Sequence, residues 1–568
     1  MRSNVPSIAP QFLRSRLTKV CVAITGVSAA EMIEKATAVV KETPFLEFRL
    51  DYLEKPLLAL PKFKQFFLDN TAATAIATCR RAANGGKFAG SLAAEVEVLS
   101  QAAEAGFHLA DLELESAESL KKAGLQKLRA TGVALVLSHH DFAATKDLDA
   151  IFARIEPFRP EFIKIVSTAN ALTDNVTLMR FLERMNDHSN IIGICMGDSG
   201  VISRVLGVRA GSAFTFAAAS PGEETGPGQI AARTLIETYR IDQVDAATKV
   251  YGVAGNPLRN SLSPIMMNTA LRRETVNAVY LALQTARLAD LLKLVQEIPI
   301  QGLSVTMPLK QDVLAHLERT DPLSAKIGAC NTILRVASGE NAGKLFGFNT
   351  DVAGIVGPLE KRMQLRGAKV LVLGAGGAAR AAVFGLRDKG AEVFILNRTP
   401  ETAQKLARQS GSKTIRKEAL AKTSFDVIVN ATPVGMAGNK AAPLLEAKDL
   451  NAKLVFDLVY NPLETPLLRL ARQQSIPIVT GVEMFVQQGA RQFEIFTGKP
   501  APEEEMLRVV LHALRQRAEA AAAEPEPKSA SIKAVPKPSP AKAAAKATPA
   551  KAAPKAPPAS AGGTKKKA

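Results

Sequence analysis

The chain has few cysteines and no long apolar run, and each absence excludes a class of protein. Its four cysteines, Cys21, Cys79, Cys195 and Cys330, stand far apart and form no CxxC pair. This spacing favours free thiols in a reducing compartment over a disulfide framework or a bound metal. No apolar stretch approaches the length of about 20 residues that a transmembrane helix needs. With 568 residues, 47% of them hydrophobic, the chain is expected to fold as three or four globular domains.

Positive charge is concentrated near the C-terminus. Residues 523–568 hold ten lysines and two glutamates, which is +8 of the net charge of +18. The Ala/Pro/Lys composition has too little apolar bulk to order itself and predicts a disordered tail over 521–568. Such a tail is either a solvated extension or a contact site for polyanions. Residues 1–17 are basic but lack an apolar signal core, which favours a cytoplasmic protein over one with a short transit peptide.

A glycine-rich turn between two expected strands predicts a dinucleotide site. Val370–Leu373 is short, apolar and β-branched, as in a buried parallel strand, and a helix and a second strand, Glu392–Leu396, follow it. The G-x-G-x-x-G/A positions allow a tight turn, a close approach to a pyrophosphate and close helix packing. A structural glycine turn without a ligand is the alternative. The small residues of the motif are Gly374, Gly376 and Ala379, and the turn expected to contact the cofactor comprises Gly374, Ala375, Gly376, Gly377 and Ala378.

The end of the second strand lacks the carboxylate that would select NAD. NAD sites usually place Asp or Glu there to accept a hydrogen bond from the ribose 2′-hydroxyl, whereas an arginine accommodates a 2′-phosphate. The residues here are Asn397, Arg398 and Thr399. Because a guanidinium binds a phosphate through a pair of hydrogen bonds, the sequence predicts NADP as the cofactor.

Eight short apolar segments alternate with helical patterns through the first 240 residues. They are Val20–Ile24, Phe45–Asp51, Ala75–Cys79, Phe107–Leu114, Val133–Leu137, Phe162–Val166, Ile191–Met196 and Ala213–Ala217. Strands that alternate with helices indicate parallel βα units, and eight of them predict a closed (β/α)8 barrel. Such barrels keep their chemistry at the carboxyl ends of the strands. The unusual polar residues of this half lie there: Glu47, Arg49, Asp51, Arg80, Asp111, Glu113, His139, His140, Lys164, Arg204 and Gln229.

Lys164 is the residue that points most directly to a reaction. It lies within the apolar segment FIKIV, where burial disfavours an ammonium, and a neutral amine is a nucleophile that forms a Schiff base with a ketone. The neighbouring segment ends in His139 and His140, and an imine needs an adjacent acid or base to move a proton. The alternative is a structural lysine that extends to the barrel end or pairs with Glu47 or Glu113.

Six motifs of this half occur together in one known family. They are ExRxD from Glu47, RxxxxGG from Arg80, SHHDF over 138–142, IKI around Lys164, MGDSGVISRVLG over 196–207 and PGQI over 227–230. With them the half resembles the type I 3-dehydroquinate dehydratases. The resemblance implies an imine between Lys164 and the substrate ketone, His140 as proton shuttle and Arg204 on the substrate carboxylate. It further implies a substrate site that includes Glu47, Arg49, Arg80, Thr225 and Gln229. Two residues depart from the family pattern: Asn84, where Glu is usual, and Thr225, where many members have Ser.

Two hydroxyls and a lysine–aspartate pair are the candidate groups of the second half. Ser261 and Ser263 lie on a loop before an expected helix with Pro264 at its start, so they either bind a carboxylate or cap the helix. Lys310 and Asp351 each follow an expected strand. A lysine and an aspartate beside a nicotinamide can protonate the oxygen of a ketone as hydride arrives at carbon. A surface salt bridge is the alternative for that pair.

The motifs NSLSP, LSVTMPLK, CNTIL and GFNTD and the glycine turn extend along nearly all of residues 248–520. With them this half resembles the shikimate dehydrogenases. The resemblance implies Lys310 and Asp351 as the catalytic pair, with Tyr460 and Gly481 near the nicotinamide. Substrate contacts are implied for Ser261, Ser263, Thr306, Asn331 and Gln488. The departures are Asn260 and Met267 where histidines are usual, Ser304 where asparagine is usual, and Thr402 where some members have a second phosphate-binding arginine.

Together the two halves predict consecutive reactions on small-molecule substrates. The first would dehydrate 3-dehydroquinate to 3-dehydroshikimate, and the second would reduce that ketone to shikimate with NADPH. The alternatives are a second half directed to quinate or NAD, and a catalytically silent barrel. The expected architecture is an α/β fold in which the barrel precedes a two-lobed dehydrogenase with a Rossmann NADP lobe. Its expected domains are a barrel over 1–245, a substrate lobe over 246–352, an NADP lobe over 353–482, returning helices over 483–520 and a tail over 521–568.

Overall fold

The computed structural model describes residues 13, 15–185, 187–188, 190–439 and 441–523. The described residues up to Ala518 form one compact unit. Residues 1–12 of the basic N-terminus and 524–568 of the predicted tail lie outside the described residues, while 521–523 end helix α17 (Glu503–Ala523). No helix in the described part of the chain combines the length and apolarity that a membrane crossing requires.

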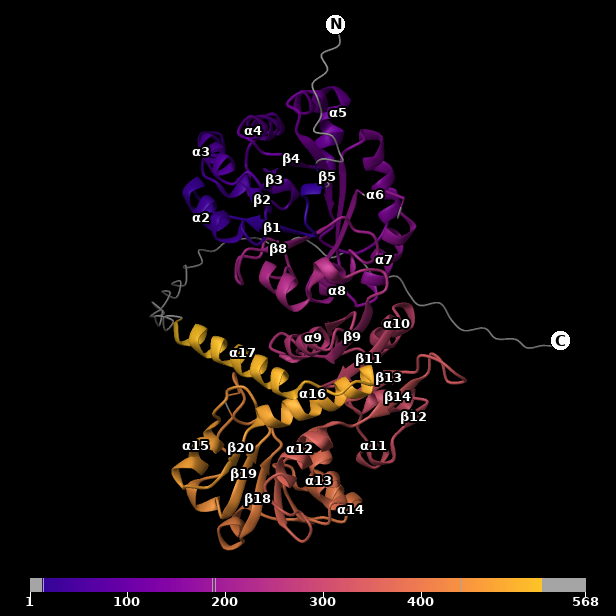
Figure 1. The fold of residues 1–568 in the computed structure, drawn as a ribbon, viewed down its shortest axis with the longest axis vertical. Helices are drawn as coiled ribbons and strands as arrows, with labels where there is room; N and C mark the ends of the chain where they lie inside the picture. The colour runs from indigo at the N-terminus through magenta and orange to yellow at the C-terminus, as the bar shows by residue number, and fades with distance from the viewer. Residues whose placement is uncertain (1–12, 14, 186, 189, 440, 524–568) are drawn as a thin grey trace, which may run out of the picture. The chain divides into compact units, whose positions relative to one another are not determined.

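The first sheet has eight parallel strands in the order β7-β6-β5-β4-β3-β2-β1-β8. They are β1 (Val20–Ile24), β2 (Phe45–Arg49), β3 (Thr74–Thr78), β4 (Leu109–Glu113), β5 (Ala134–His140), β6 (Phe162–Thr168), β7 (Ile191–Met196) and β8 (Thr215–Ala218). The loop before β8 closes the ring, because Ala213 N donates to Ile191 O at 2.8 Å. The predicted (β/α)8 barrel is therefore confirmed, with this loop contact at the β7–β8 seam. Figure 1 shows the surrounding helices α2 (Ala29–Val39), α3 (Pro56–Asp69), α4 (Leu92–Glu104), α5 (Leu114–Arg129), α6 (Leu148–Ile155), α7 (Asp174–Arg184) and α8 (Val201–Leu206).

Period-two alternation along β2 separates the barrel interior from its helical shell. Phe45 packs inside against Phe214, with ring centroids 4.8 Å apart. Phe48 faces the opposite side and packs against Phe63 of α3, at 5.2 Å. Glu47 shares the interior face of Phe45 because it is two residues further along the strand. The amino end of the interior is thus apolar, and its carboxyl end carries the polar groups.

A second, mixed sheet forms the lobe after the barrel, in the order β10-β9-β11-β13-β14-β12. Its strands are β9 (Lys249–Gly255), β10 (Ala278–Gln284), β11 (Ile300–Val305), β12 (Arg319–Thr320), β13 (Thr332–Arg335) and β14 (Leu345–Phe348). Strand β13 runs antiparallel to both neighbours, and the other pairs are parallel. The helices of this lobe are α9 (Ser263–Arg273), α10 (Leu288–Glu297) and α11 (Pro322–Ile327).

The third sheet is parallel throughout, in the order β17-β16-β15-β18-β19-β20. This is the doubly wound order, in which a dinucleotide binds outside the carboxyl ends of the central strands. The strands are β15 (Lys369–Leu373), β16 (Glu392–Leu396), β17 (Lys413–Thr414), β18 (Phe425–Asn430), β19 (Ala452–Asp457) and β20 (Ile478–Val479). Helices α12 (Asp351–Glu360), α13 (Gly377–Asp388), α14 (Pro400–Ser410), α15 (Pro466–Gln473) and α16 (Gly481–Thr497) complete the dehydrogenase half. The predicted Rossmann lobe is confirmed.

Candidate active sites

Lys164 lies among carboxylates at the carboxyl end of the barrel. Its Nζ atom is 2.9 Å from Asp111 Oδ2 and 3.6 Å from Glu47 Oε1, and it lies over the Phe216 ring at 3.9 Å from the centroid. The side chain is only 5% exposed. Burial alone would raise the pKa of Asp111, but Lys164 and Arg80 outweigh burial and hold that pKa well below its usual value. The Lys164 amine is therefore held at the carboxyl end of the barrel by two carboxylates and an aromatic ring.

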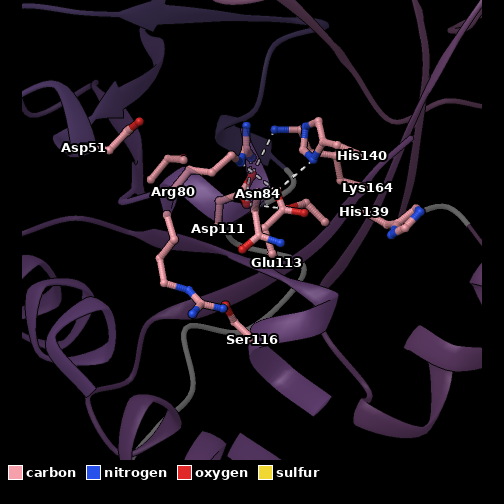
Figure 2. Close-up of polar contacts among 12 residues, drawn as sticks. Asp51, Arg80, Asn84, Asp111, Glu113, Ser116, His139, His140 and Lys164 are labelled. Carbon is pink, nitrogen blue, oxygen red and sulfur yellow. Dashed lines mark hydrogen bonds and ion pairs between the residues drawn. The ribbon is translucent and has the colours of Figure 1, made fainter. Parts of the chain in front are cut away.

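His140 faces this cluster and His139 does not, because consecutive side chains of a strand point to opposite faces. His140 Nδ1 lies 2.8 Å from Glu113 Oε1, and its ring stacks on Phe142. His139 Nδ1 lies 3.0 Å from Glu115 Oε1 instead. Figure 2 shows His140 directed toward Glu113 and His139 directed away. Burial and the charge of Arg80 lower the pKa of His140, and Glu113 only partly opposes them, so the imidazole is neutral at neutral pH.

Two of the predicted substrate-binding arginines are already paired with carboxylates of the chain. Arg80 contacts Glu113 Oε1 through Nε at 2.6 Å and Asp111 Oδ1 through Nη2 at 3.3 Å. Burial alone would lower the pKa of Arg80, but these two carboxylates raise it. Arg49 donates to both oxygens of Asp51, at 2.9 and 2.8 Å. Both arginines thus stabilise the arrangement of the carboxylates in the site, in addition to any contact with a substrate.

Arg204 is buried without an anion. It lies on α8, is 3% exposed, and donates to the carbonyl oxygens of Phe216 at 3.3 Å and Pro227 at 3.2 Å. It forms no ion pair with any residue that the structure describes, and its Nε atom has no hydrogen-bond partner there. Burial lowers its pKa to about 10. A buried cation of this kind is stabilised by an incoming carboxylate, which suits the role that the resemblance implies.

The remaining predicted residues of the barrel site are held by short local contacts. Thr225 donates to Gln229 Oε1 from its backbone N at 2.6 Å and from its hydroxyl at 3.2 Å, which orients the Gln229 amide. Glu47 accepts from Thr78 Oγ1 at 2.8 Å. Asn84, the departure noted in the sequence, contacts Glu115 Oε2 at 3.5 Å. Asn84 therefore lies on the His139 side of the cluster.

In the second half the structure brings Lys310, Asp351 and Asn331 together. Lys310 Nζ lies 2.5 Å from Asp351 Oδ2, and Asn331 Nδ2 donates to Asp351 Oδ1 at 2.7 Å. Asp351 is 3% exposed, while the Lys310 side chain is 18% exposed. The surface salt bridge considered above is therefore wrong for this pair. Asp351 also begins α12, where the helix dipole stabilises a carboxylate.

The other predicted substrate residues line the same lobe. Ser261 Oγ accepts from the backbone N of Ser263 at 3.3 Å. The capping alternative is wrong, because the N-cap residue of α9 is Leu262 and no side chain caps this helix. Thr306 follows β11, and its backbone N donates to Ala254 O at 2.9 Å. Gln488 lies on α16, is 9% exposed and donates to Phe485 O at 2.9 Å. These contacts place the three residues in the substrate lobe.

Sequence reasoning missed the residue that supports Asn331. Gln492 Nε2 donates to Asn331 O at 3.1 Å and to Thr332 Oγ1 at 3.0 Å, and Gln492 Oε1 accepts from Ser304 Oγ at 2.7 Å. Tyr280 OH in turn lies 2.5 Å from Ser304 Oγ. The Ser304 hydroxyl thus has a partner on each side, Tyr280 and Gln492. The one feature of the sequence that could have indicated Gln492 is its position one helical turn after Gln488.

The glycine turn fits a bound dinucleotide. Gly374 has φ +112°, which favours glycine, and Ala379 is fully buried against the sheet. A Cβ atom built on Gly376 would meet no heavy atom within 4 Å, so the space beside it is open to a ligand. A Cβ on Gly377 would lie 3.6 Å from Lys310 Cδ. The amino end of α13, which favours an anion, thus lies beside the Lys310–Asp351 pair.

The loop that carries Tyr460 is held by a buried aspartate, another residue the sequence did not reveal. Asp457 accepts from Asn430 Nδ2 at 2.9 Å and from Thr465 Oγ1 at 2.6 Å. Burial raises the pKa of Asp457 to about 6 despite these donors. Tyr460 stacks on Phe485 of α16, with centroids 4.5 Å apart. Gly481 begins α16 where a Cβ would lie 2.3 Å from Val459 O, so its role here is close packing.

Arg398 has the exposure expected of a phosphate-binding residue. It is exposed just after β16 and makes no hydrogen bond or ion pair with another residue in the described ranges. Asn397 Nδ2 donates to Thr399 O at 3.0 Å, which shapes the loop. No carboxylate occupies positions 397–399, in agreement with the sequence argument for a 2′-phosphate.

Arg398→Ala is expected to raise the apparent KM for NADPH by roughly 10-fold and that for NADH by less than twofold. The reason is that only NADPH carries the 2′-phosphate, and a charged hydrogen bond is worth about 1.5–3 kcal/mol. Initial-rate kinetics with both cofactors measure the difference, with exposed Arg408→Ala as the control. Equal changes for the two cofactors would show that Arg398 does not bind the phosphate.

Comparison with known proteins assigns both halves. A family model described as type I 3-dehydroquinase matches residues 20–246. Models described as the shikimate dehydrogenase substrate binding domain, shikimate/quinate 5-dehydrogenase and the shikimate 5′-dehydrogenase C-terminal domain match residues 253–333, 359–458 and 481–511. Both resemblances seen in the sequence are therefore confirmed.

Of three similar proteins, one matches most of the chain and two match about half of it. The bifunctional 3-dehydroquinate dehydratase/shikimate dehydrogenase, chloroplastic, of Arabidopsis thaliana is 33% identical over 512 residues, which are 85% of this chain and 83% of the relative. The shikimate dehydrogenase (NADP(+)) of Pyrococcus furiosus is 38% identical over 281 residues, 48% of this chain and 99% of the relative. The crystal structure of shikimate 5-dehydrogenase from Thermus thermophilus with NADP(H) and shikimate is 38% identical and covers 47% of this chain and 100% of that chain, with a TM-score of 0.44. The chain belongs to the family of bifunctional shikimate-pathway enzymes that join a type I 3-dehydroquinate dehydratase, a lyase, to a shikimate dehydrogenase, an oxidoreductase.

Proposed function

We propose that the barrel dehydrates 3-dehydroquinate through an imine on Lys164, and that the second half reduces the resulting 3-dehydroshikimate to shikimate with NADPH. The observation that carries the proposal is the burial of Lys164 Nζ among Asp111 and Glu47, beside a strand that directs His140 into the same cluster. A lysine that served only to stabilise the barrel would not need an adjacent, neutral histidine. The silent-barrel alternative is disfavoured for the same reason.

In the barrel, each step of the dehydration has a residue suited to it. The Lys164 amine attacks the ketone carbon and water leaves, which forms the imine. The imine withdraws electrons from the adjacent C–H bond, and His140, neutral at neutral pH, accepts that proton. The electron pair expels the neighbouring hydroxyl as water, with the proton returned by His140. Hydrolysis of the imine then consumes one water and frees Lys164, so the net change is the loss of one water.

Arg204 fits the carboxylate of this substrate. Its guanidinium is buried and contacts only carbonyl oxygens among the described residues, one of them from Phe216, whose ring also contacts Lys164 Nζ. A substrate carboxylate would therefore be held near the imine carbon. The hydroxyl groups of the substrate would then be bound by the side-chain oxygen and amide atoms of Glu47, Thr225 and Gln229.

In the second half, Lys310 and Asp351 are proposed to protonate the ketone oxygen during its reduction. NADPH, when bound along the glycine turn, supplies the hydride. Lys310 is suited to the proton transfer because its Nζ atom is only partly exposed and is held by Asp351, which Asn331 fixes from the other side. Ser261, Ser263, Thr306 and Gln488 are proposed to hold the substrate in this lobe, and Tyr460 and Gly481 are proposed to lie near the nicotinamide.

The purified chain should convert 3-dehydroquinate to shikimate with consumption of one NADPH for each shikimate formed. Product analysis by mass spectrometry together with NADPH absorbance tests both reactions at once. Replacement of NADPH by NADH, or of the substrate by quinate with an oxidised cofactor, should give lower kcat/KM values. A preference for quinate or for NADH would overturn the assignment of substrate or cofactor.

His140→Ala is expected to lower the dehydration rate by about 10²-fold, because a positioned acid or base contributes at least that much. His139→Ala is the matched control. The two residues are adjacent in sequence, but His139 contacts Glu115 outside the Lys164 cluster and should change the rate by less than threefold. A larger loss for His139→Ala than for His140→Ala would exchange the two assignments.

The domain limits given above, a cytoplasmic location and contact of the lysine-rich tail with polyanions stay predictions. The tail from residue 524 lies outside the described residues. Each of the two reactions is assigned to residues before position 520, so the proposal does not depend on the tail.

A further inference from the structure

The Nδ1 atom of His140 faces the carboxylate of Glu113. The two atoms, Nδ1 and Oε1, are 2.8 Å apart, and the side chains are 8% and 3% exposed. The contact is a close electrostatic one, because the Nδ1 atom has no hydrogen-bond partner of normal geometry among the described residues. Glu113 is the last residue of β4, and His140 is the last residue of the neighbouring strand β5. Asn84 has no charge, and its amide contacts Glu115. Within the described residues, Glu113 is thus the carboxylate that contacts His140.

Glu113 is itself fixed by two further groups. Arg80 Nε lies 2.6 Å from Glu113 Oε1, and Ser138 Oγ lies 3.1 Å from the same oxygen. Burial alone would raise the pKa of Glu113, but His140 and Arg80 outweigh burial and lower it, so the group is ionised. Figure 2 shows this arrangement, in which Arg80, Glu113 and His140 converge from three successive strands or strand ends. A carboxylate held in this way has little freedom to move away from the imidazole.

We propose that Glu113 is the positioning residue for His140 in the dehydration: its carboxylate lies beside Nδ1 and favours a proton on that nitrogen, and so it leaves the Nε2 lone pair free to take the substrate proton. The inference rests on the proposed role of His140 as the proton shuttle. A neutral imidazole carries its proton on one nitrogen, and the partner of that nitrogen determines the tautomer and the ring orientation. The stacking of His140 on Phe142 restricts the ring plane further.

The charges around His140 give Glu113 a second effect. The ionisable groups that face the ring are Glu113 and Asp111 from β4, Arg80 from the loop after β3, and Lys164 from β6. Arg80 and Lys164 disfavour an imidazolium, while Glu113 favours it. When His140 takes a proton from the substrate, the charge that forms lies beside the Glu113 carboxylate. Removal of that carboxylate should therefore weaken His140 as a base and lower the pH at which it becomes protonated.

A continuous series of ion pairs also connects the two proposed catalytic groups. Lys164 contacts Asp111 at 2.9 Å, Asp111 contacts Arg80 at 3.3 Å, Arg80 contacts Glu113 at 2.6 Å, and Glu113 contacts His140 at 2.8 Å. Opposite charges alternate from Lys164 to Glu113, and the neutral imidazole of His140 ends the series. Glu113 is therefore placed to fix the histidine, as Asp111 fixes the lysine, with Arg80 between the two carboxylates.

Glu113→Gln, which keeps the shape and removes the charge, tests the proposal in the full-length protein. The kcat for dehydration is expected to fall at least about 10-fold with KM within about twofold, since an orienting carboxylate acts on the reaction more than on binding. The acid limb of the pH profile of kcat/KM should move to lower pH by about one unit, because His140 loses the group that stabilises its protonated form. Glu115→Gln is the matched control: it removes a carboxylate two residues away that contacts His139, and it should leave both the rate and the acid limb unchanged.

Borohydride trapping with 3-dehydroquinate separates this inference from the proposed function. An adduct on Lys164 in both wild type and Glu113→Gln, together with the shifted limb, supports the inference. No adduct in the wild type would overturn the proposed function and this inference with it. An adduct in both proteins with an unchanged rate and limb in Glu113→Gln would overturn the inference alone. Should Glu113→Gln fail to fold, Glu113→Asp keeps the charge on a shorter side chain. A lower kcat with the limb near its wild-type position supports the inference, and an unchanged kcat overturns it.

Discussion

Lys164→Ala should abolish dehydration of 3-dehydroquinate while the same protein continues to reduce 3-dehydroshikimate. The methyl side chain of alanine is not a nucleophile and cannot form the imine. The reduction should persist because the two proposed sites are built on separate sheets. The expected dehydration rate is that of the uncatalysed background. The expected reduction rate is within about twofold of wild type, since the change lies outside the dehydrogenase half. Separate assays of the two half-reactions measure both values.

Chemical trapping identifies the lysine independently of the rate. Borohydride added with 3-dehydroquinate should add the mass of a reduced adduct to the wild-type peptide that contains Lys164, and Lys164→Ala should show no adduct. The control is Lys127→Ala, which removes a lysine whose side chain is 63% exposed and paired with Glu97. It should retain both the adduct and the dehydration rate. An adduct that maps to any other lysine would contradict the assignment.

The sequence predicted those features that depend on local patterns. The alternation of apolar segments with helices predicted the barrel, and the polar residues at the carboxyl ends of the expected strands, Glu47 among them, predicted where its site would lie. The glycine turn is equally local, and Gly374 has the positive φ of +112° that favours glycine in such a turn. Lys164 was recognisable because a lysine inside a short apolar strand conflicts with the pattern around it.

The partners of these residues were not predictable, because they depend on the register between strands that are distant in sequence. The alternative considered for Lys164 was a structural lysine paired with Glu47 or Glu113. The structure places Asp111 at 2.9 Å and Glu47 at 3.6 Å, while Glu113 pairs with His140 and Arg80. Of that alternative, the pair with Glu47 is present, and Glu113 contacts His140 and Arg80 instead.

The support around Asn331 was hidden for the same physical reason. The contact of Tyr280 with Ser304 joins β10 to β11, and Gln492 reaches them from α16, 188 residues after Ser304. The three residues are all buried, so in sequence each resembles an ordinary core or helix position. Only the tertiary fold shows that they form one network behind the proposed catalytic aspartate.

Lys310→Ala should lower kcat for the reduction of 3-dehydroshikimate by about 10³-fold, within the usual range for a positioned acid. The dehydration rate should stay at its wild-type value. The physical reason is that Lys310 Nζ, 2.5 Å from Asp351, is the proposed proton donor, and alanine leaves the ketone oxygen without one as hydride arrives. Initial-rate assays of NADPH oxidation with 3-dehydroshikimate measure kcat and KM separately.

An exposed ion pair in the same lobe provides the matched control. Lys344 lies 2.8 Å from Glu318, and their side chains are 42% and 50% exposed. Lys344→Ala removes a lysine–carboxylate contact of similar length and should leave kcat within about twofold, since exposed pairs contribute little. Asp351→Asn alone should also lower kcat. Because the two residues act as one unit, the double variant of Lys310→Ala and Asp351→Asn should be no slower than the slower single variant. Additive losses in the double variant would show that Lys310 and Asp351 act separately, and an unchanged kcat in Lys310→Ala would exclude it as the proton donor.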